Sequence, residues 1–229
     1  KTATAYAKAI GFTKTQFFDV DGAQAYIFSN KDDCVVACRG TQPTEWNDVK
    51  ADLKLFKVES ETLGEVHRGF KKEVDDLWPT MKPAIEKLGA KKTYQVDIWF
   101  TGHSLGGAAA TIGAARLGTF VTGCFTYGSP RVGNRAFTKS IFCPVWRFRN
   151  KRDLVTRVPT LFMGFKHVGK FCYIDENGTL RIGAVSFARL FKDSFKSMFN
   201  FTIGDGVLDH SIGDYCKHIN SCDKVLVKK

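Results

Sequence analysis

Long hydrophobic runs are missing from this 229-residue sequence. None approaches the roughly 18–20 apolar residues that a membrane-spanning helix needs, so we expect no such helix. Proline is scarce, and the 6 Pro and 21 Gly follow no period, which excludes collagen-like chains and Pro/Gly linkers. Internal repeats and low-complexity tracts are also absent. Because 44% of the residues are apolar and 13% aromatic, disorder is excluded too, and we expect one globular domain spanning residues 1–229.

Spacings typical of metal and nucleic-acid sites are absent as well. No Cys–His set has zinc spacing, and there is no zinc knuckle or RNP-type aromatic motif, so we expect no zinc site and no nucleic-acid partner. The Cys count of 7 is odd, which leaves at least one thiol unpaired within the chain. Cys216 and Cys222 have a loop-like spacing that could close a disulfide.

Positive charge is what the sequence has in excess. It carries 34 Lys and Arg against 23 Asp and Glu, a formal net charge of +11. Such an excess favours anionic surfaces, including acidic polymers and lipid headgroups, without choosing among them, and a solvated basic surface with no partner is also open. The chain starts at Lys1 rather than Met, which suits a processed secreted protein and equally a trimmed chain. We expect an extracellular monomer.

Strand-like and helix-like segments alternate through the middle of the chain. Helical spacing of apolar residues predicts helices over 1–10, 69–88, 105–118 and 211–220, the second kinked or split at Pro79 and Pro83. Strands are expected at 16–20, 23–29, 33–40, 94–100, 121–127 and 144–149, with a hairpin over 170–182. The alternation favours an α/β fold whose mostly parallel central sheet has helices on both faces. Asp21-Gly22 predicts an N-terminal antiparallel hairpin.

The segment Gly102–Gly107 (GHSLGG) directly follows an apolar strand and directly precedes a helix. A serine there stands on a sharp turn that exposes its hydroxyl, and the crowding requires nearly side-chain-free residues two positions before and after it. Gly102 and Gly106 meet that requirement around Ser104. The helix also directs its N-terminal N–H groups to this place, which stabilises an oxyanion. The segment therefore predicts a nucleophile elbow, with an ordinary Gly-rich turn as the alternative.

A serine nucleophile needs a base, and the base needs an orienting carboxylate. In this architecture the carboxylate and then the histidine follow the serine along the chain. Asp153 lies just past the carboxyl end of the strand 144–149, where such sheets build their sites. The alternative is an exposed Asp paired with a neighbouring Arg. Among the later histidines, His210 lies in a loop before the last helix and is favoured by position over His167 and His218.

Seven sequence blocks carry a more specific signal. They are CRGT (38–41), VHRGF (66–70), TGHSLGGA (101–108), YGSPRVGN (127–134), NKRDLVTRVP (150–159), GFKHVG (164–169) and LDHSIGDY (208–215). In these blocks, and in their order, the chain resembles the class 3 (filamentous-fungal type) lipases of the α/β-hydrolase fold. The resemblance covers nearly everything from residue 34 to residue 215.

The resemblance implies roles for five residues. Ser104 would be the nucleophile, Asp153 the orienting acid and His210 the base. Thr41 aligns with the residue whose backbone N–H and hydroxyl form one half of the oxyanion hole, and the N–H of Leu105 would form the other half. Two fixed donors suit the chemistry, since losing one costs about 10²–10³ in rate. No metal or organic cofactor is implied.

The resemblance also implies a lipase, a serine ester hydrolase that cleaves acyl glycerols or related lipid esters at an interface through an acyl-enzyme. In this family an amphipathic lid follows the RG-Thr/Ser strand. Here that segment is Gln42–Asp52, whose apolar members are Trp46 and Val49. Its length differs from the fungal pattern and it has few apolar residues, so a soluble-ester carboxylesterase of feruloyl-esterase type stays open. A non-catalytic lipid-binding protein on the same scaffold is a further alternative.

The segment Ser186–Phe199 departs most from the family pattern. It places apolar side chains on a helical stripe flanked by Arg189, Lys192 and Lys196. One interpretation is core packing by a surface helix. The other is a helix beside the acyl pocket whose aromatic face meets lipid and whose lysines meet phosphate, which would give peripheral membrane contact.

Overall fold

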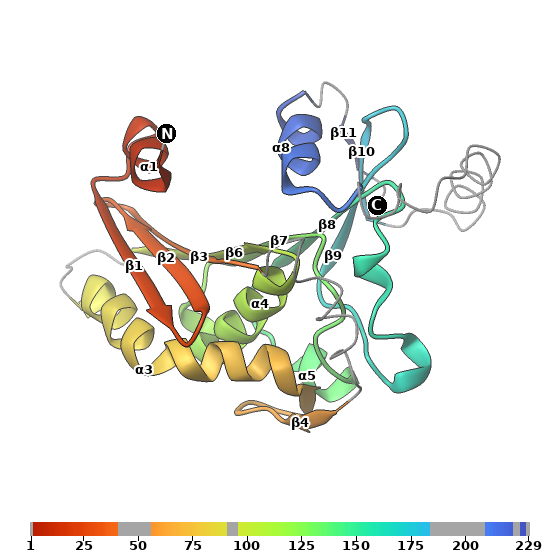
Figure 1. Ribbon diagram of the computed structural model, residues 1–229, viewed down its shortest axis with the longest axis horizontal. Helices are drawn as coiled ribbons and strands as arrows, with labels where there is room; N and C mark the ends of the chain where they lie inside the picture. Colours follow the sequence, from red (N-terminus) through yellow and green to blue (C-terminus); the bar gives the residue numbers. More distant parts are fainter. Residues whose placement is uncertain (1, 41–55, 91–95, 184–208, 222–224, 228–229) are drawn as a thin grey trace.

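A nine-stranded sheet forms the centre of the structure, a computed structural model that describes residues 2–40, 56–90, 96–183, 209–221 and 225–227 (Figure 1). The strands lie in the order β1-β2-β3-β6-β7-β8-β9-β10-β11. From β3 to β9 every neighbouring pair is parallel, which confirms the predicted mostly parallel sheet. The predicted lid, the segment 186–199, Thr41 and Cys222 lie outside the described residues.

The elements have the following bounds. The strands of the large sheet are β1 Lys14–Val20, β2 Ala23–Ser29, β3 Asp33–Cys38, β6 Asp97–His103, β7 Gly123–Tyr127, β8 Val145–Asn150, β9 Lys170–Ile174, β10 Leu180–Ile182 and β11 Val225–Val227. A small second sheet pairs β4 Lys57–Glu59 with β5 Glu65–His67. The helices are α1 Ala3–Ala9, α3 Arg68–Ala90, α4 Leu105–Leu117, α5 Arg135–Lys139 and α8 Ile212–Asn220, with 3₁₀ turns η2 Gly118–Phe120, η3 Val155–Arg157 and η4 Leu161–Met163.

Both predicted hairpins are present. β1 and β2 pair antiparallel, and the two residues between them, Asp21 and Gly22, have φ angles of 50° and 86°. Positive φ at both positions is the geometry of a type I′ turn, which the Asp-Gly pair favours. β9 and β10 also pair antiparallel, with Leu180 opposite Ile174.

Helices cover both faces of the sheet, as the alternation predicts. On one face α3 and α4 pack over the strands, and their apolar side chains join the large buried core (Figure 1). On the other face Tyr215 of α8 is buried against Phe148 of β8 together with Cys172 and Ile174 of β9. This second packing brings the C-terminal helix over the strand that ends near Asp153.

The helix expected over residues 69–88 is one continuous helix, α3, with Pro79 and Pro83 inside it. Both prolines lie on its exposed side, where the carbonyls that lose an N–H partner can turn to water. The strand expected at 33–40 is shorter, and its burial differs from that of a strand covered on both faces. Alternate residues of β3 are fully buried, whereas those between them are only half-buried. The apolar sequence of this strand therefore predicts more burial than the strand has.

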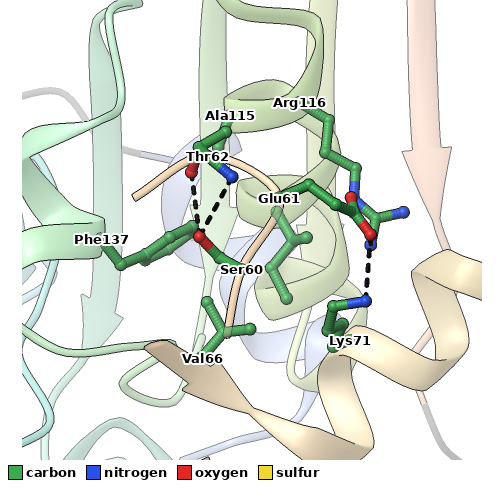
Figure 2. Close-up of a pocket in the computed structure, with 9 residues that line it drawn as sticks. Ser60, Glu61, Thr62, Val66, Lys71, Ala115, Arg116 and Phe137 are labelled. Carbon is green, nitrogen blue, oxygen red and sulfur yellow. Dashed lines mark hydrogen bonds and ion pairs between the residues drawn. The ribbon is translucent and has the colours of Figure 1, made fainter. Parts of the chain in front are cut away.

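An ion-pair network fastens the β4–β5 turn to the helices (Figure 2). Arg116 of α4 pairs with Glu61 of the turn and with Asp75 of α3. Lys71 of α3 contacts the same two carboxylates, at 3.0 Å from Glu61 and 2.8 Å from Asp75. The Arg116 side chain is only 5% exposed, and its guanidinium also lies over the Trp78 ring. A network with a buried arginine at its centre is worth more than isolated surface pairs.

Candidate active site

Ser104 is the single residue between β6 and α4, and its backbone is strained. Its φ is 57°, in a region that L residues rarely adopt. A Cβ added at Gly102 would lie 2.1 Å from the carbonyl oxygen of Gly106, and one added at Gly106 would lie 2.3 Å from the carbonyl oxygen of Cys38. Only glycine fits at either position. The local geometry is thus the sharp strand-to-helix turn that the sequence predicts.

Three side chains predicted as site residues lie in one hydrogen-bonded chain. The Nε2 atom of His210 lies 2.8 Å from Oγ of Ser104, and its Nδ1 atom lies 2.9 Å from Oδ2 of Asp153. These residues come from the turn after β6, the loop after β8 and the loop before α8. The fold therefore joins residues that are 106 and 57 positions apart in the sequence.

Burial at this site is greater than the sequence reasoning expected. The sequence predicts an elbow serine with its hydroxyl in the open, yet Ser104 is 2% exposed and its hydroxyl contacts the His210 ring. The alternative of an exposed Asp153 paired with a nearby arginine is wrong: Asp153 is completely buried and contacts His210 instead. Low local polarity strengthens the hydrogen bonds between these groups.

Tyr215 is a site residue that the sequence reasoning missed. Its hydroxyl donates a 2.6 Å hydrogen bond to Oδ2 of Asp153 and accepts one of 2.9 Å from the backbone N–H of Asn150. The other carboxylate oxygen, Oδ1, accepts from the N–H of Val155 at 2.9 Å. Both oxygens of Asp153 are thus held by fixed donors. The block LDHSIGDY contains Tyr215, but its local sequence does not indicate that the hydroxyl points at a residue 62 positions earlier.

The loop that carries His210 is tethered at several points. Nε2 of His103 lies 2.6 Å from the backbone oxygen of His210, and the two rings are 4.5 Å apart. Burial, and then the proximity of His210, lowers the pKa of His103 to about 4, so His103 is neutral at neutral pH and its Nε2–H donates to that oxygen. The side-chain amide of Asn150 donates to the backbone oxygen of Asp209 at 3.1 Å, and the N–H of Arg152 donates to its carboxylate at 3.2 Å.

Two glycines let backbone approach the site closely. Gly128, at φ 61°, follows β7, and a Cβ there would lie 2.8 Å from Oδ2 of Asp153 and 2.9 Å from the His210 ring. A Cβ at Gly40 would lie 3.3 Å from Cβ of Ser104. Gly40 thus brings the segment after β3 beside the serine. Leu105 is the first residue of α4, where helix geometry leaves backbone N–H groups without intrahelical partners.

The remaining candidates from the sequence lie elsewhere. His167 is half-buried and bonds through Nε2 to the backbone oxygen of Thr156 at 2.8 Å, rather than standing on the surface. Asp175, a second buried carboxylate just after a strand of the sheet, pairs with Arg181 at 2.8 Å. In the part of the chain that the structure describes, no three His, Cys, Asp or Glu side chains gather as a metal would require. No helix among the described residues has the length and apolarity to cross a membrane.

The sheet order, the strained serine between β6 and α4 and the buried Ser–His–Asp chain are those of an α/β-hydrolase. A family model described as Lipase (class 3) matches residues 35–163. The chain belongs to the class 3 lipase family, and the resemblance expected from the sequence blocks is confirmed.

Known proteins of similar sequence and structure include several fungal lipases. A lipase of Rhizopus niveus is 36% identical over 159 residues, which are 63% of this chain and 38% of that protein. Secreted mono- and diacylglycerol lipase 1 of Fusarium solani is 36% identical over 117 residues, 48% of this chain and 34% of that protein. The solved triacylglyceride lipase of Rhizomucor miehei superposes with a TM-score of 0.62 at 26% identity, over 73% of this chain and 67% of that one. The chain therefore spans well under half of the two curated relatives.

Proposed function

We propose that this protein is a serine ester hydrolase of lipase type that cleaves acyl glycerols or related lipid esters. The observation that carries the proposal is the unbroken hydrogen-bonded chain from Ser104 through His210 to Asp153. The relative from Rhizomucor miehei is a triacylglyceride lipase, and that from Fusarium solani a mono- and diacylglycerol lipase, which supports acyl glycerols as the substrate class. The latter is also secreted, which supports an extracellular location.

The geometry suits an acyl-enzyme mechanism. His210 takes the proton of Ser104 as Oγ of Ser104 attacks the ester carbonyl carbon. His210 then gives that proton to the leaving alcohol. Asp153 orients the ring and stabilises its charged form. Water then attacks the acyl carbon and gives a proton to His210, which passes it to Oγ of Ser104 as the acyl–Oγ bond breaks and the fatty acid leaves.

The oxyanion of each tetrahedral intermediate needs fixed donors near 3 Å. We assign the N–H of Leu105, at the start of α4, as one donor, because it follows the serine at the positive end of the helix dipole. The backbone N–H and hydroxyl of Thr41 form the second half. The position of Gly40 beside Ser104 supports this assignment, since Thr41 is the next residue. We also propose that Gln42–Asp52 forms a lid and that the protein is a monomer.

Labelling by a fluorophosphonate probe tests the proposal at the reacting atom. Wild-type protein should be labelled, and Ser104→Ala should not. Ser129→Ala is the matched control, because Ser129 is another buried serine nearby whose hydroxyl bonds to the backbone of Pro130; labelling should persist in this variant. Folded wild-type protein that resists the probe would favour a non-catalytic lipid-binding protein.

A substrate panel then separates lipase from esterase. A lipase should turn over an acyl glycerol much faster once it forms an emulsion. Equal turnover of short dissolved esters, or a preference for feruloyl esters, would favour the esterase alternative. Varying acyl length and headgroup in the same panel defines the substrate.

A further inference from the structure

A turn of exposed apolar side chains lies on the loop between β8 and β9, drawn in green and teal in Figure 1. Leu161, Phe162 and Met163 form the single 3₁₀ turn η4, and all three are exposed, Phe162 fully. We call Leu161–Met163 the apolar turn. Two residues later Phe165 is completely buried, so the same loop does offer core positions to aromatic side chains. Adjacent exposed apolar side chains mark interaction sites more often than single ones do.

The loop holds the apolar turn in a defined position. Upstream of it, Arg131 donates from its backbone N–H to the oxygen of Val158 at 2.8 Å and from its guanidinium to the oxygen of Pro159 at 2.9 Å. Downstream, the N–H of Lys166 donates to the oxygen of Gly133 at 2.8 Å. Both ends are thus fixed to the segment after β7. Little conformational entropy remains to be lost when such a turn binds a partner.

The charged residues that flank the apolar turn along the chain have one sign. Between Leu154 and Lys170 the sequence contains no Asp or Glu. Arg157 and Lys166 are exposed on the two sides of the turn. Lys57 of β4 approaches as well, since its Nζ would lie 3.1 Å from a Cβ at Gly164, but it pairs with Glu65 at 3.5 Å and adds no net charge. An apolar tip within a basic rim complements a surface that has an apolar interior and anionic headgroups.

We propose that the apolar turn inserts into lipid surfaces that carry anionic headgroups, with Arg157 and Lys166 at the headgroup level. A lipid surface fits better than a protein partner, because a specific protein interface buries about 800 Å² on each side, whereas a few apolar side chains suffice for attachment to lipid. This proposal rests on the proposed lipase function, because attachment through the turn would hold the enzyme at its lipid substrate. Binding itself can be measured without catalysis.

Vesicle co-sedimentation tests the apolar part. All variants carry Ser104→Ala, so that lipid is not consumed, and the vesicles are phosphatidylcholine with or without phosphatidylglycerol. Leu161→Ser/Phe162→Ser should weaken binding at least about tenfold with little change in melting temperature, since Phe162 is fully exposed and Leu161 is 51% exposed. Phe142→Ser is the matched control: Phe142 is 72% exposed in the separate segment before β8, and binding should not change.

The charged rim is tested in the same assay. Arg157→Glu/Lys166→Glu should weaken binding to vesicles with phosphatidylglycerol, most at low salt, whereas Lys8→Glu/Lys14→Glu, with the same change in net charge, should have a much smaller effect. Unchanged vesicle binding in Leu161→Ser/Phe162→Ser would overturn the proposal. So would a dimer in solution that this variant converts to monomer without affecting vesicle binding, because the turn would then join two copies.

Failure of this proposal and failure of the proposed function are distinguishable. If vesicle binding depends on the apolar turn but the protein resists the fluorophosphonate probe, the proposed hydrolase function is wrong and the lipid-binding role of the turn stands. If the protein is labelled by the probe and hydrolyses esters but its vesicle binding does not depend on the turn, the hydrolase function stands and the lipid-binding role of the turn is wrong.

Discussion

The hydroxyl of Tyr215 donates a 2.6 Å hydrogen bond to Oδ2 of Asp153, the oxygen that also contacts His210. Burial raises the pKa of Tyr215 well above its ordinary value, and the negative charge of Asp153 acts in the same direction. The phenol therefore stays protonated, and acts as a hydrogen-bond donor to Asp153, at every pH where the protein would work. Tyr215 is a positioning residue: it holds the carboxylate that orients the proposed base.

Replacing Tyr215 with Phe removes this donor and leaves the ring in place. We expect kcat to fall about tenfold or more with little change in KM, because the carboxylate loses its fixed orientation toward His210. The backbone N–H of Asn150 also loses its acceptor, which should cost about 1–3 kcal/mol of stability. Steady-state kinetics on a dissolved ester and thermal unfolding measure the two effects.

Tyr127→Phe is the matched control for this change. Tyr127 is half-buried, and its ring lies 6.2 Å from that of Tyr215, but its ring stacks on Phe148 rather than contacting Asp153. Its kcat should stay near that of the wild type. Equal losses of kcat in both variants would mean that the loss in Tyr215→Phe is not specific to its hydrogen bond with Asp153.

The two buried carboxylates near the ends of β8 and β9 should behave differently. Asp153→Asn keeps the shape but leaves His210 badly oriented, which should cost on the order of 10⁴ in kcat by analogy with the protease triad. Asp175→Asn removes the partner of Arg181, so its melting temperature should fall while kcat per folded molecule stays close to the wild type. Near-full activity in Asp153→Asn would assign the orienting role to another carboxylate.

The parts of the site that the sequence predicted are local or ordered along the chain. The elbow around Ser104 was predictable because its requirements, glycine two positions before and after, lie within five residues. The order of Ser104, Asp153 and His210 was predictable from the architecture, and the blocks of the family resemblance supported it. The N-terminal hairpin followed from its Asp-Gly turn alone.

What the sequence could not supply depends on contacts between distant segments. The Tyr215 hydroxyl reaches Asp153 only because α8 packs over β8 on the face opposite α4, and no local pattern encodes that packing. The contact between Ser104 and His210 likewise joins residues that are 106 positions apart. The helix α3 stayed continuous through Pro79 because tertiary packing of its buried face outweighs the lost hydrogen bonds.

Gly106 permits a close approach on which the elbow depends. A Cβ at this position would lie 2.3 Å from the carbonyl oxygen of Cys38 and 2.7 Å from the backbone nitrogen of Gly40, neither of which can move aside as a side chain would. Gly106→Ala should therefore lose several kcal/mol, on the order of 3 or more, through overpacking. Gly213→Ala is the control: the nearest atom to its Cβ would be 3.4 Å away. Urea unfolding compares them, and equal midpoints would contradict the close approach.

Glu73 of α3 should make the protein less stable as pH rises, which is the opposite of what a carboxylate usually does. Burial, and then the nearby charge of Asp76, raises the pKa of Glu73 to about 7 from 4.5, while Lys72 lowers it only in part. The folded protein therefore keeps the Glu73 proton over a range of pH in which the unfolded chain has released it. Over that range the unfolded state binds fewer protons than the folded state, so the free energy of unfolding falls as pH rises.

Glu73→Gln should remove this dependence, because the amide resembles the protonated acid and never ionises. Below pH 4.5 the variant and the wild type should be about equally stable. As pH rises from 4.5 to 7 the wild type should lose stability relative to the variant, and above 7 the difference should level off on the order of 3 kcal/mol. Urea unfolding across this range measures the difference. Glu86→Gln, at an exposed glutamate of the same helix, removes the same charge and is the matched control. A wild type that gains stability over Glu73→Gln as pH rises would show that Glu73 ionises favourably in the fold.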